Sequence, residues 1–280
     1  MALAASAGYA LIDAGDGRRL ERFGELVVDR TAPGAVDRRG QPADWGAADL
    51  RFDRSRGWSG RRDVGAPWTV EIEGLTLELR ATDSGGVGLF PEQLANATWL
   101  AGAIRARGAG AGAPAVLNLF AHTGLLTLVA ARAGATVTHV DAARGAVAWG
   151  RRNAELSGLA DRPIRWIVDD ALEFVRREGR RGRRFDGILL DPPSYGHGGK
   201  QPWRIEADLP ELLDACNAVA APNLFLLLTA HTTGIDGDRL EGAVREAFPA
   251  LARRVAALPL ELEAESGALL HLGTAIRAPR

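Results

Sequence analysis

From residue 115 onward, short apolar segments alternate with segments of helical pattern, and this order constrains the fold more than any other feature. The segments with the length and composition of buried strands cover residues 115–120, 135–140, 164–168, 185–190 and 223–229. The helical patterns between and after them cover 124–132, 144–156, 172–177, 209–220 and 239–250. Because parallel strands need crossover helices, the alternation predicts an α/β fold with a mostly parallel sheet and helices on both faces.

The two ends of this region add detail. A helical stripe over 91–107 precedes the first strand, and Pro91 suits its first turn. Strand candidates at 258–264 and 269–276 flank the turn Glu265-Ser266-Gly267. A hairpin there makes at least one strand of the sheet antiparallel.

The first 84 residues follow another pattern. Residues 70–79 alternate apolar and polar side chains around Glu73 and Gly74, which is typical of a β-hairpin with one buried face. Turn formers and charged residues interrupt most of the preceding sequence. We therefore expect a small β-rich module over residues 1–84 and an α/β domain over residues 85–280.

Charge and cysteine content limit the classes of function. The 34 Lys and Arg residues nearly balance 35 Asp and Glu residues, and the net charge is -1. This balance excludes a chain held to nucleic acid or membrane mainly by bulk charge. A local basic face stays open, because arginine pairs occur at 151–152, 176–177, 180–181 and 183–184. Such pairs are also typical of solvated helix ends.

The chain lacks the signals of secretion and of membrane insertion. No apolar segment approaches the roughly 20 residues of a membrane-spanning helix, and residues 1–10 lack the pattern of a signal peptide. The single cysteine, Cys216, excludes an internal disulfide. We expect a cytoplasmic protein that makes no membrane contact and holds no metal.

Ligands of open parallel sheets bind at the carboxyl ends of the strands, and the first predicted strand ends in a turn suited to a ligand. This turn covers residues 118–124, with the sequence NLFAHTG. Gly124 lets the backbone approach a ligand closely, and the helix amides beyond it favour an anionic group. The turn lacks G-x-G-x-x-G, which argues against a dinucleotide pyrophosphate.

Three further strand ends carry carboxylates. Asp141 could accept hydrogen bonds from both hydroxyls of a ribose, or it could cap the next helix. Asp169 or Asp170 could accept a hydrogen bond from the amine of a purine, and Asp170 could instead cap its helix. The fourth strand ends in residues 191–196, DPPSYG, where paired prolines stiffen the loop. Its oxygens could accept hydrogen bonds from an amino group beside a transferable methyl.

Taken together, these strand ends resemble the class I S-adenosylmethionine (SAM) methyltransferases. The resemblance implies a Rossmann-like, mostly parallel seven-stranded sheet with an antiparallel closing hairpin. The match extends to the branch that includes the 23S rRNA methyltransferases for cytosine C5 and guanine N7. The segments that carry it are 88–93, 116–124, 168–171, 191–196 and 266–273. The opening residues 9–24 resemble a poorly characterised subgroup of that branch.

The resemblance implies roles for individual residues. Asn118, Ala121 and Gly124 would line the methionine end of SAM. Asp141 would hold the ribose, and Asp170 or Asp169 the adenine. Phe90 and Gln93 would close over the cofactor. Asp191, Pro192 and Pro193 would face the methyl group and the acceptor.

The chain departs from the branch at one catalytic position. The cytosine-C5 enzymes carry a cysteine nucleophile after the fifth strand, and this chain has His231 there. Cys216 lies among apolar residues of a predicted helix, so we expect a packed core thiol. Transfer to nitrogen needs mainly alignment and exclusion of water. His231 or His197 is a candidate base, and either could instead be structural or lie on the surface.

These observations favour SAM-dependent methylation of an rRNA nucleobase, at a nitrogen rather than at C5. Two alternatives stay open. The near-neutral charge and the lack of an obvious RNA-binding module favour a methyltransferase for a small metabolite. A SAM-binding protein without catalysis is the other, and the intact 191–196 loop argues against it. The residues expected to contact the acceptor, by phosphate contacts or base stacking, are Ser194, Tyr195, His197, Lys200, Trp203 and Arg204.

Overall fold

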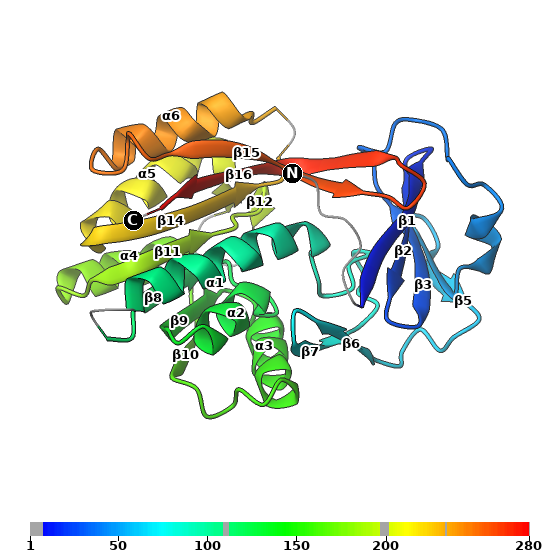
Figure 1. Cartoon of the computed structure of the whole chain (residues 1–280), viewed down its shortest axis with the longest axis horizontal. Helices are drawn as coiled ribbons and strands as arrows, with labels where there is room; N and C mark the ends of the chain where they lie inside the picture. Colours follow the sequence, from blue (N-terminus) through cyan, green and yellow to red (C-terminus); the bar gives the residue numbers. More distant parts are fainter. Residues whose placement is uncertain (1–7, 109–111, 197–201, 233, 280) are drawn as a thin grey trace. The chain divides into compact units, whose positions relative to one another are not determined.

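The computed structural model describes residues 8–108, 112–196, 202–232 and 234–279. The chain forms two compact units (Figure 1). The first contains Met1–Ala95, Glu155–Ser157 and Leu260–Leu272. The second contains Asn96–Ala154, Gly158–Pro259 and Gly273–Arg280. A domain boundary after residue 84 stays a prediction.

A seven-stranded sheet forms the framework of the second unit, in the order β10-β9-β8-β11-β14-β16-β15. The bounds of its strands are β8 Ala115–Leu119, β9 Thr136–Asp141, β10 Ile164–Val168, β11 Phe185–Leu190, β14 Ala220–Ala230, β15 Ala256–Glu263 and β16 Leu269–Ala278. The first five strands in that order pair in parallel, and β14 pairs antiparallel with β16. The predicted α/β class, the parallel sheet and the antiparallel closing hairpin are confirmed.

Helices cover both faces of this sheet. Their bounds are α1 Leu94–Gly108, α2 Leu125–Arg132, α3 Arg144–Leu156, α4 Ala171–Arg180, α5 Ile205–Ala218 and α6 Gly237–Ala247. One face packs against α4, α5 and α6, because Ile188 and Leu226 share a buried core with Phe174, Leu212 and Leu240.

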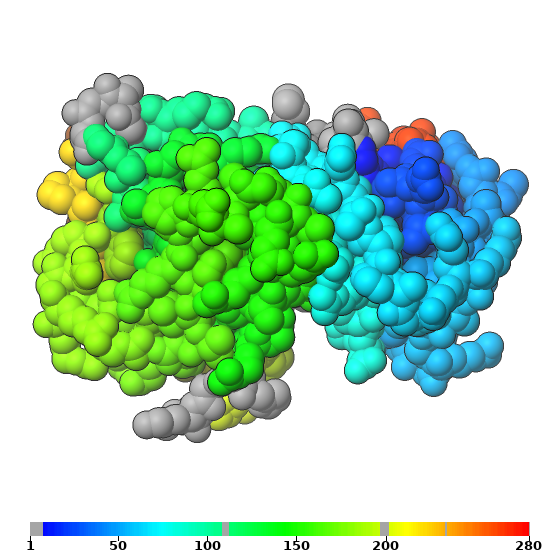
Figure 2. Space-filling view, turned by 90° about the horizontal axis from the view of Figure 1, so that it is seen from below, coloured from blue at the N-terminus to red at the C-terminus, as the bar shows by residue number. Residues whose placement is uncertain are grey.

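On the other face of the sheet, Phe225 contacts Trp99 of α1 with ring centroids 6.3 Å apart. His139 of β9 meets Thr127 of α2 on the same face. Successive strand residues point to opposite faces, so the continuous apolar strands supply both layers of core. In Figure 2 the segment from α3 to α4, in green to yellow-green, forms a continuous part of the surface.

The first unit contains a five-stranded sheet and a separate hairpin. The sheet has the order β1-β2-β3-β4-β5, with bounds Tyr9–Gly15, Arg18–Phe23, Leu26–Thr31, Leu50–Asp53 and Gly57–Gly60. The hairpin of β6 (Trp68–Ile72) and β7 (Leu75–Leu79) turns between Ile72 and Leu75, which confirms the prediction for residues 70–79. The closing turn also packs in this unit, because Glu265 N donates to Leu11 O at 2.8 Å.

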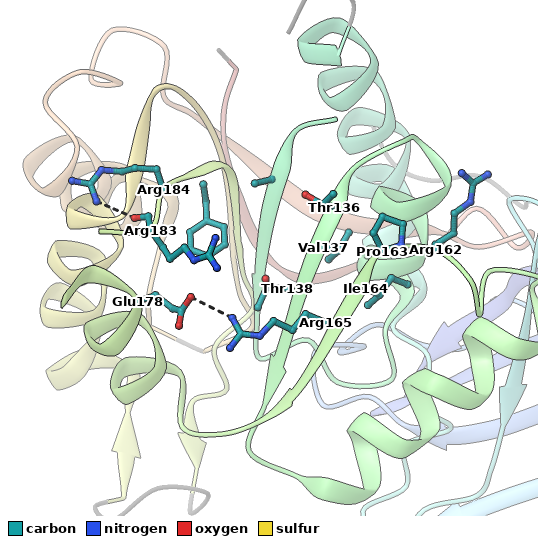
Figure 3. Close-up of a pocket in the computed structure, with 12 residues that line it drawn as sticks. Thr136, Val137, Thr138, Arg162, Pro163, Ile164, Arg165, Glu178, Arg183 and Arg184 are labelled. Atoms are coloured by element: carbon teal, nitrogen blue, oxygen red, sulfur yellow. Dashed lines mark hydrogen bonds and ion pairs between the residues drawn. The ribbon is translucent and has the colours of Figure 1, made fainter. Parts of the chain in front are cut away.

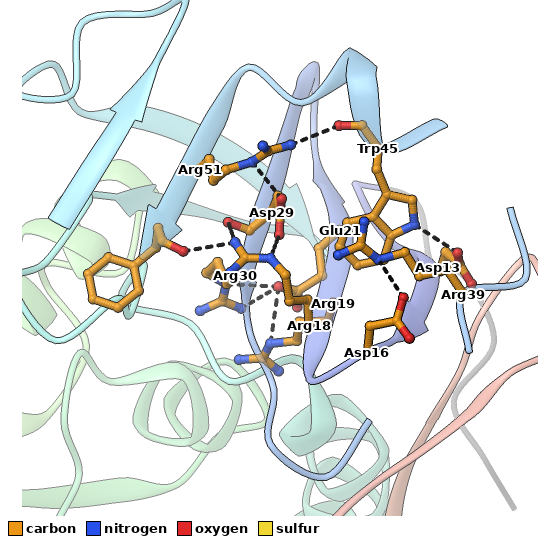
Figure 4. Close-up of polar contacts among 11 residues, drawn as sticks. Asp13, Asp16, Arg18, Arg19, Glu21, Asp29, Arg30, Arg39, Trp45 and Arg51 are labelled. Atoms are coloured by element: carbon orange, nitrogen blue, oxygen red, sulfur yellow. Dashed lines mark hydrogen bonds and ion pairs between the residues drawn. The ribbon is translucent and has the colours of Figure 1, made fainter. Parts of the chain in front are cut away.

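Buried charges explain why most strands of the first unit escape prediction (Figure 4). Glu21 of β2 and Arg30 of β3 are buried, and Arg30 Nη2 lies 2.6 Å from Glu21 Oε2. Asp29 of β3, also buried, pairs with Arg18 and Arg51. Ionised residues that face inward in pairs remove the apolar alternation by which a strand is normally recognised.

The helix expected from Pro91 begins instead as a 3-10 turn over Pro91–Gln93, and α1 starts at Leu94. Proline suits this tighter entry because it needs no backbone donor in the first turn. Short strands β12 (Tyr195–Gly196) and β13 (Trp203–Arg204) also pair with each other. Within the described ranges, no helix is both long enough and apolar enough to cross a membrane.

Candidate functional site

The carboxyl ends of five adjacent parallel strands meet at one edge of the seven-stranded sheet. β10, β9, β8, β11 and β14 are neighbours in that order. The residues that follow them along the chain include Asp169, His122, Asp191 and His231, and Asp141 ends β9 itself. The parallel pairing therefore gathers at one edge the residue types that the sequence marks as candidate ligands.

The turn after β8 has an unusual backbone. Phe120, His122 and Gly124 have φ values of 53°, 49° and 91°. Left-handed φ is uncommon for residues other than glycine and costs free energy, so the surrounding structure must hold it. The holding contacts include Ala121 N to Val140 O at 3.1 Å. Backbone strain of this kind is concentrated at ligand sites.

Asp141 fixes this turn from the end of β9. Its Oδ2 accepts a hydrogen bond from His122 N at 2.8 Å, and its Oδ1 accepts one from Ala143 N at 2.8 Å. Each carboxylate oxygen has two lone pairs, so both oxygens can accept one further donor. The side chain thus combines a structural role with the capacity to bind a pair of hydroxyls.

Asn118 lies beneath the turn rather than on its surface. It is buried, and its Nδ2 donates to Thr127 Oγ1 at 2.9 Å. The Thr127 hydroxyl is also 2.9 Å from Nδ1 of the buried His139. Burial lowers the pKa of His139 to about 3, so this imidazole is neutral at neutral pH. The network ties the end of β8 to α2 and β9.

The two aspartates after β10 have different environments. Asp169 pairs with Arg177, with Oδ2 and Nη2 2.6 Å apart. Asp170 caps α4, since its Oδ1 accepts a hydrogen bond from Glu173 N at 3.0 Å. Asp170, but not Asp169, lines a cavity of about 270 Å³ together with Phe120 and Trp203, among others.

That cavity has an aromatic wall. The rings of Phe120 and Trp203 have centroids 5.3 Å apart, and Trp203 Nε1 donates to Pro193 O at 2.7 Å. The wall therefore links the turn after β8 to the loop after β11. A cavity near the lower end of the usual range for small-molecule sites, about 300–1,000 Å³, suits one planar ring system.

The ends of β11 and β14 bring a carboxylate and an imidazole together. Leu190 pairs with Leu228, which places Asp191 beside Thr229. Asp191 Oδ1 accepts a hydrogen bond from Thr229 Oγ1 at 2.5 Å and lies 3.1 Å from His231 Nε2. Burial acts to raise the pKa of Asp191, but the charge and hydrogen bond of His231 and the Thr229 hydroxyl together lower it. Asp191 is thus an ionised partner for His231.

The loop after β11 contains the residues expected to contact an acceptor. Pro192 is buried, Pro193 is exposed, and Ser194 Oγ lies 2.7 Å from Thr232 Oγ1. Tyr195 is 67% exposed and pairs with Arg204 across β12 and β13. His197 and Lys200 lie outside the described residues.

Phe90 and Gln93 belong to the first unit. Phe90 is 42% exposed, whereas Gln93 is buried and its backbone N donates to Phe90 O at 3.0 Å. Their expected closure over a cofactor stays a prediction.

Cys216 has no place at this edge of the sheet. It is fully buried on α5 in the core shared with α4 and α6, and burial raises the pKa of its thiol. A neutral core thiol is a poor nucleophile. Within the described part of the chain, no group of three or more His, Cys, Asp or Glu residues is arranged to hold a metal ion.

His122 is a further candidate site residue, which the sequence does not single out. Burial lowers its pKa, while the charges of Asp141 and Asp191 act in the opposite direction. Its backbone N donates to Asp141 Oδ2 at 2.8 Å. Its position inside the turn that follows the first predicted strand could have marked it as a candidate. Thr229, which binds Asp191, gave no signal because its role depends on the pairing of β11 with β14.

Comparison with known proteins identifies the family and the fold. Residues 48–255 match the family described as S-adenosylmethionine-dependent methyltransferase. The crystal structure of a SAM-dependent methyltransferase from Agrobacterium tumefaciens is 34% identical, covers 100% of this chain and 94% of that chain, and superimposes with a TM-score of 0.91. The structure of SMU.776, complexed with SAH, is 17% identical over 97% of this chain and 76% of that chain. Its TM-score of 0.74 shows the shared fold.

Curated relatives match over shorter regions. Ribosomal RNA large subunit methyltransferase K from Neisseria meningitidis serogroup B is 35% identical over 35% of this chain and 28% of its own length. Ribosomal RNA large subunit methyltransferase I from Shewanella denitrificans is 28% identical over 48% of this chain and 32% of its own length. The chain thus spans about a third or less of these relatives. The family model nevertheless matches well over half of the chain, and the Agrobacterium structure matches along all of it. The chain therefore belongs to the S-adenosylmethionine-dependent methyltransferase family.

Proposed function

We propose that this protein methylates a nitrogen of an rRNA nucleobase, with SAM as the methyl donor. The observation that carries the proposal is the pairing of Asp191 with His231, 3.1 Å apart at the ends of β11 and β14. By the resemblance of the sequence, His231 stands after the fifth strand, where cytosine-C5 methyltransferases carry a nucleophilic cysteine. A base suits a nitrogen acceptor that must lose a proton.

The residues at the carboxyl edge fit the cofactor. Gly124, with φ at 91°, gives the turn after β8 a left-handed backbone that other residues rarely adopt, and a Cβ there would lie against Gly150 and His139. Asp141 keeps acceptor capacity for two ribose hydroxyls beyond its two backbone bonds. The cavity beside Phe120, Asp170 and Trp203 suits the adenine ring. When bound, SAM supplies a methyl group already activated by a sulfonium charge.

The Asp191–His231 pair indicates which ring nitrogen of His231 would take the proton that the acceptor loses. If His231 donates its Nε2–H to Asp191 Oδ1, the neutral tautomer keeps its lone pair on Nδ1. Nδ1 is then the atom that takes the proton which the acceptor nitrogen loses. The carboxylate holds the ring in place and stabilises the imidazolium that forms. Asp191 is a positioning residue in this scheme, and Thr229 in turn holds Asp191.

The choice of rRNA rests on the relatives. The matched relatives are ribosomal RNA large subunit methyltransferases K and I, and segments 88–93 and 266–273 resemble the same branch. Exposed Tyr195, with Trp203 and Arg204 across the β12–β13 pair, offers rings and a cation to an unstacked base and its phosphate. An rRNA acceptor is consistent with a cytoplasmic location, which forms part of the proposal.

Methyl transfer by variants tests the proposal. Purified protein, radiolabelled SAM and rRNA from a strain that lacks the gene should give labelled rRNA. His231→Ala should lower kcat by about 10²–10⁴-fold, the usual contribution of a general base, and leave SAM affinity within twofold. Cys216→Ala is the matched control and should keep its activity. Full activity of His231→Ala, or loss of activity in a folded Cys216→Ala, would contradict the proposal.

A further inference from the structure

The amino-terminal edge of the seven-stranded sheet carries a groove of about 450 Å³. Ala115, Thr136, Ile164 and Phe185 line it, and they are the first residues of β8, β9, β10 and β11. These four strands are neighbours, and parallel strands lie about 4.8 Å apart, so the groove crosses about 14 Å of the sheet. The turn that would hold SAM lies at the opposite end of β8, about 17 Å away for five residues of strand.

The groove is strongly basic. Arg162, Arg165, Arg183 and Arg184 line it, and Glu178 is the one acidic residue in its described lining. Figure 3 shows Arg183 and Arg184 on one side of the groove and Arg162 on the other, with Thr138 of β9 between them. The local charge therefore departs sharply from the near balance of the whole chain.

The acidic residue holds one arginine in place without neutralising the groove. Glu178 is 1% exposed, and its Oε2 lies 3.3 Å from Arg165 Nη1 (Figure 3). Its Oε1 lies 2.8 Å from Arg181 Nη1. One buried carboxylate is thus shared by two guanidinium groups, which leaves an excess of positive charge even at this pair.

The other three arginines are exposed. Within the described ranges, Arg162, Arg183 and Arg184 make no ion pair, although Arg184 Nη1 donates to the backbone O of Arg183 at 2.9 Å. Guanidinium groups bind phosphate oxygens in bidentate geometry. Cations spaced along an open groove fit a chain of phosphates better than a single small anion.

We propose that this groove binds the phosphodiester backbone of the RNA acceptor, away from the edge where the methyl group is transferred. This inference rests on the proposed rRNA acceptor and adds a second contact surface to it. Phosphate contacts fix the register and orientation of a nucleic acid without reading its bases. The groove would anchor the RNA while the carboxyl edge selects the nucleobase.

A triple variant tests the groove. The test variant changes three groove residues to Gln: Arg162, Arg183 and Arg184. The control variant loses the same charge at exposed residues on and after α6, by changing Arg239, Arg245 and Arg253 to Gln. The probe is a short fluorescein-labelled single-stranded RNA, titrated by anisotropy at several salt concentrations. Each lost phosphate contact lowers the slope of log K against log salt by about 0.7 for single strands, so the groove variant should lose about 2.

Kinetics separate this inference from the proposed function. With rRNA as acceptor, the groove variant should raise KM at least tenfold and keep kcat and SAM affinity, whereas the control should match the unaltered protein. If the unaltered protein methylates rRNA and the groove variant has the same KM and salt slope as the control, the groove assignment alone is overturned. If the unaltered protein neither binds nor methylates RNA, both proposals are overturned.

Discussion

Replacing Asp141 by alanine tests the part of the site expected to hold the ribose of the cofactor. The carboxylate has two backbone bonds of 2.8 Å and room for two more donors. A hydrogen bond to a charged group contributes about 1.5–3 kcal/mol, and each 1.4 kcal/mol changes affinity tenfold. The loss of even one such bond therefore weakens SAM binding by about 10- to 100-fold.

Isothermal titration calorimetry with S-adenosylhomocysteine measures this change without turnover. Asp141→Asn keeps one oxygen and should fall between the alanine variant and the unaltered protein. Asp161→Asn is the control, because Asp161 is exposed and lies before β10, at the end of that strand opposite to the site. Equal affinity of a folded Asp141→Ala and the unaltered protein would refute the ribose assignment. Equal weakening by Asp161→Asn would show that the effect is not specific to Asp141.

Three further predictions concern buried groups. Cys216, whose thiol pKa is raised by burial, should not react with a thiol reagent in the native protein and should react once urea unfolds it; rapid native labelling would contradict the core assignment. Burial lowers the pKa of His139 from 6.5 to about 3. As the pH drops below 6.5, the unfolded chain therefore takes up a proton on this imidazole while the folded protein does not. The free energy of unfolding should then fall by up to about 1.4 kcal/mol per pH unit. His139→Asn should reduce this dependence in urea titrations at pH 7 and pH 5, and an unchanged dependence would refute the shift. Thr127→Val should destabilise the protein by at least about 2 kcal/mol, because it deprives Asn118 and His139 of a buried partner; a neutral effect would show that water or other groups replace it.

The α/β unit was predictable because its signals are local. Strands buried on both faces appear as continuous apolar segments, and residues that follow them in the sequence must lie at one edge of a parallel sheet. Asp141, Asp170 and Asp191 could therefore be placed at the same edge from the sequence. Most strands of the five-stranded sheet in the first unit could not be predicted, since Glu21 and Arg30 face inward as an ion pair and disrupt the apolar pattern.

Features that depend on the pairing of distant strands needed the structure. The contact of Asp191 with Thr229 and His231 follows from the register of β11 with β14. The basic groove likewise depends on which strands are neighbours, because its lining comes from the starts of four of them. The sequence showed the arginine pair at 183–184 but could not show that Arg162 lies across a groove from it.

Mapping the methylated nucleotide shows directly which atom of the RNA receives the methyl group. rRNA from a strain that lacks the gene is incubated with SAM and either the purified protein or His231→Ala, digested to nucleosides and analysed by mass spectrometry. We expect one methylated nucleobase nitrogen with the unaltered protein and strongly reduced methylation with the variant. A methyl group on cytosine C5, or rRNA that gains no methyl group while a small metabolite does, would contradict it.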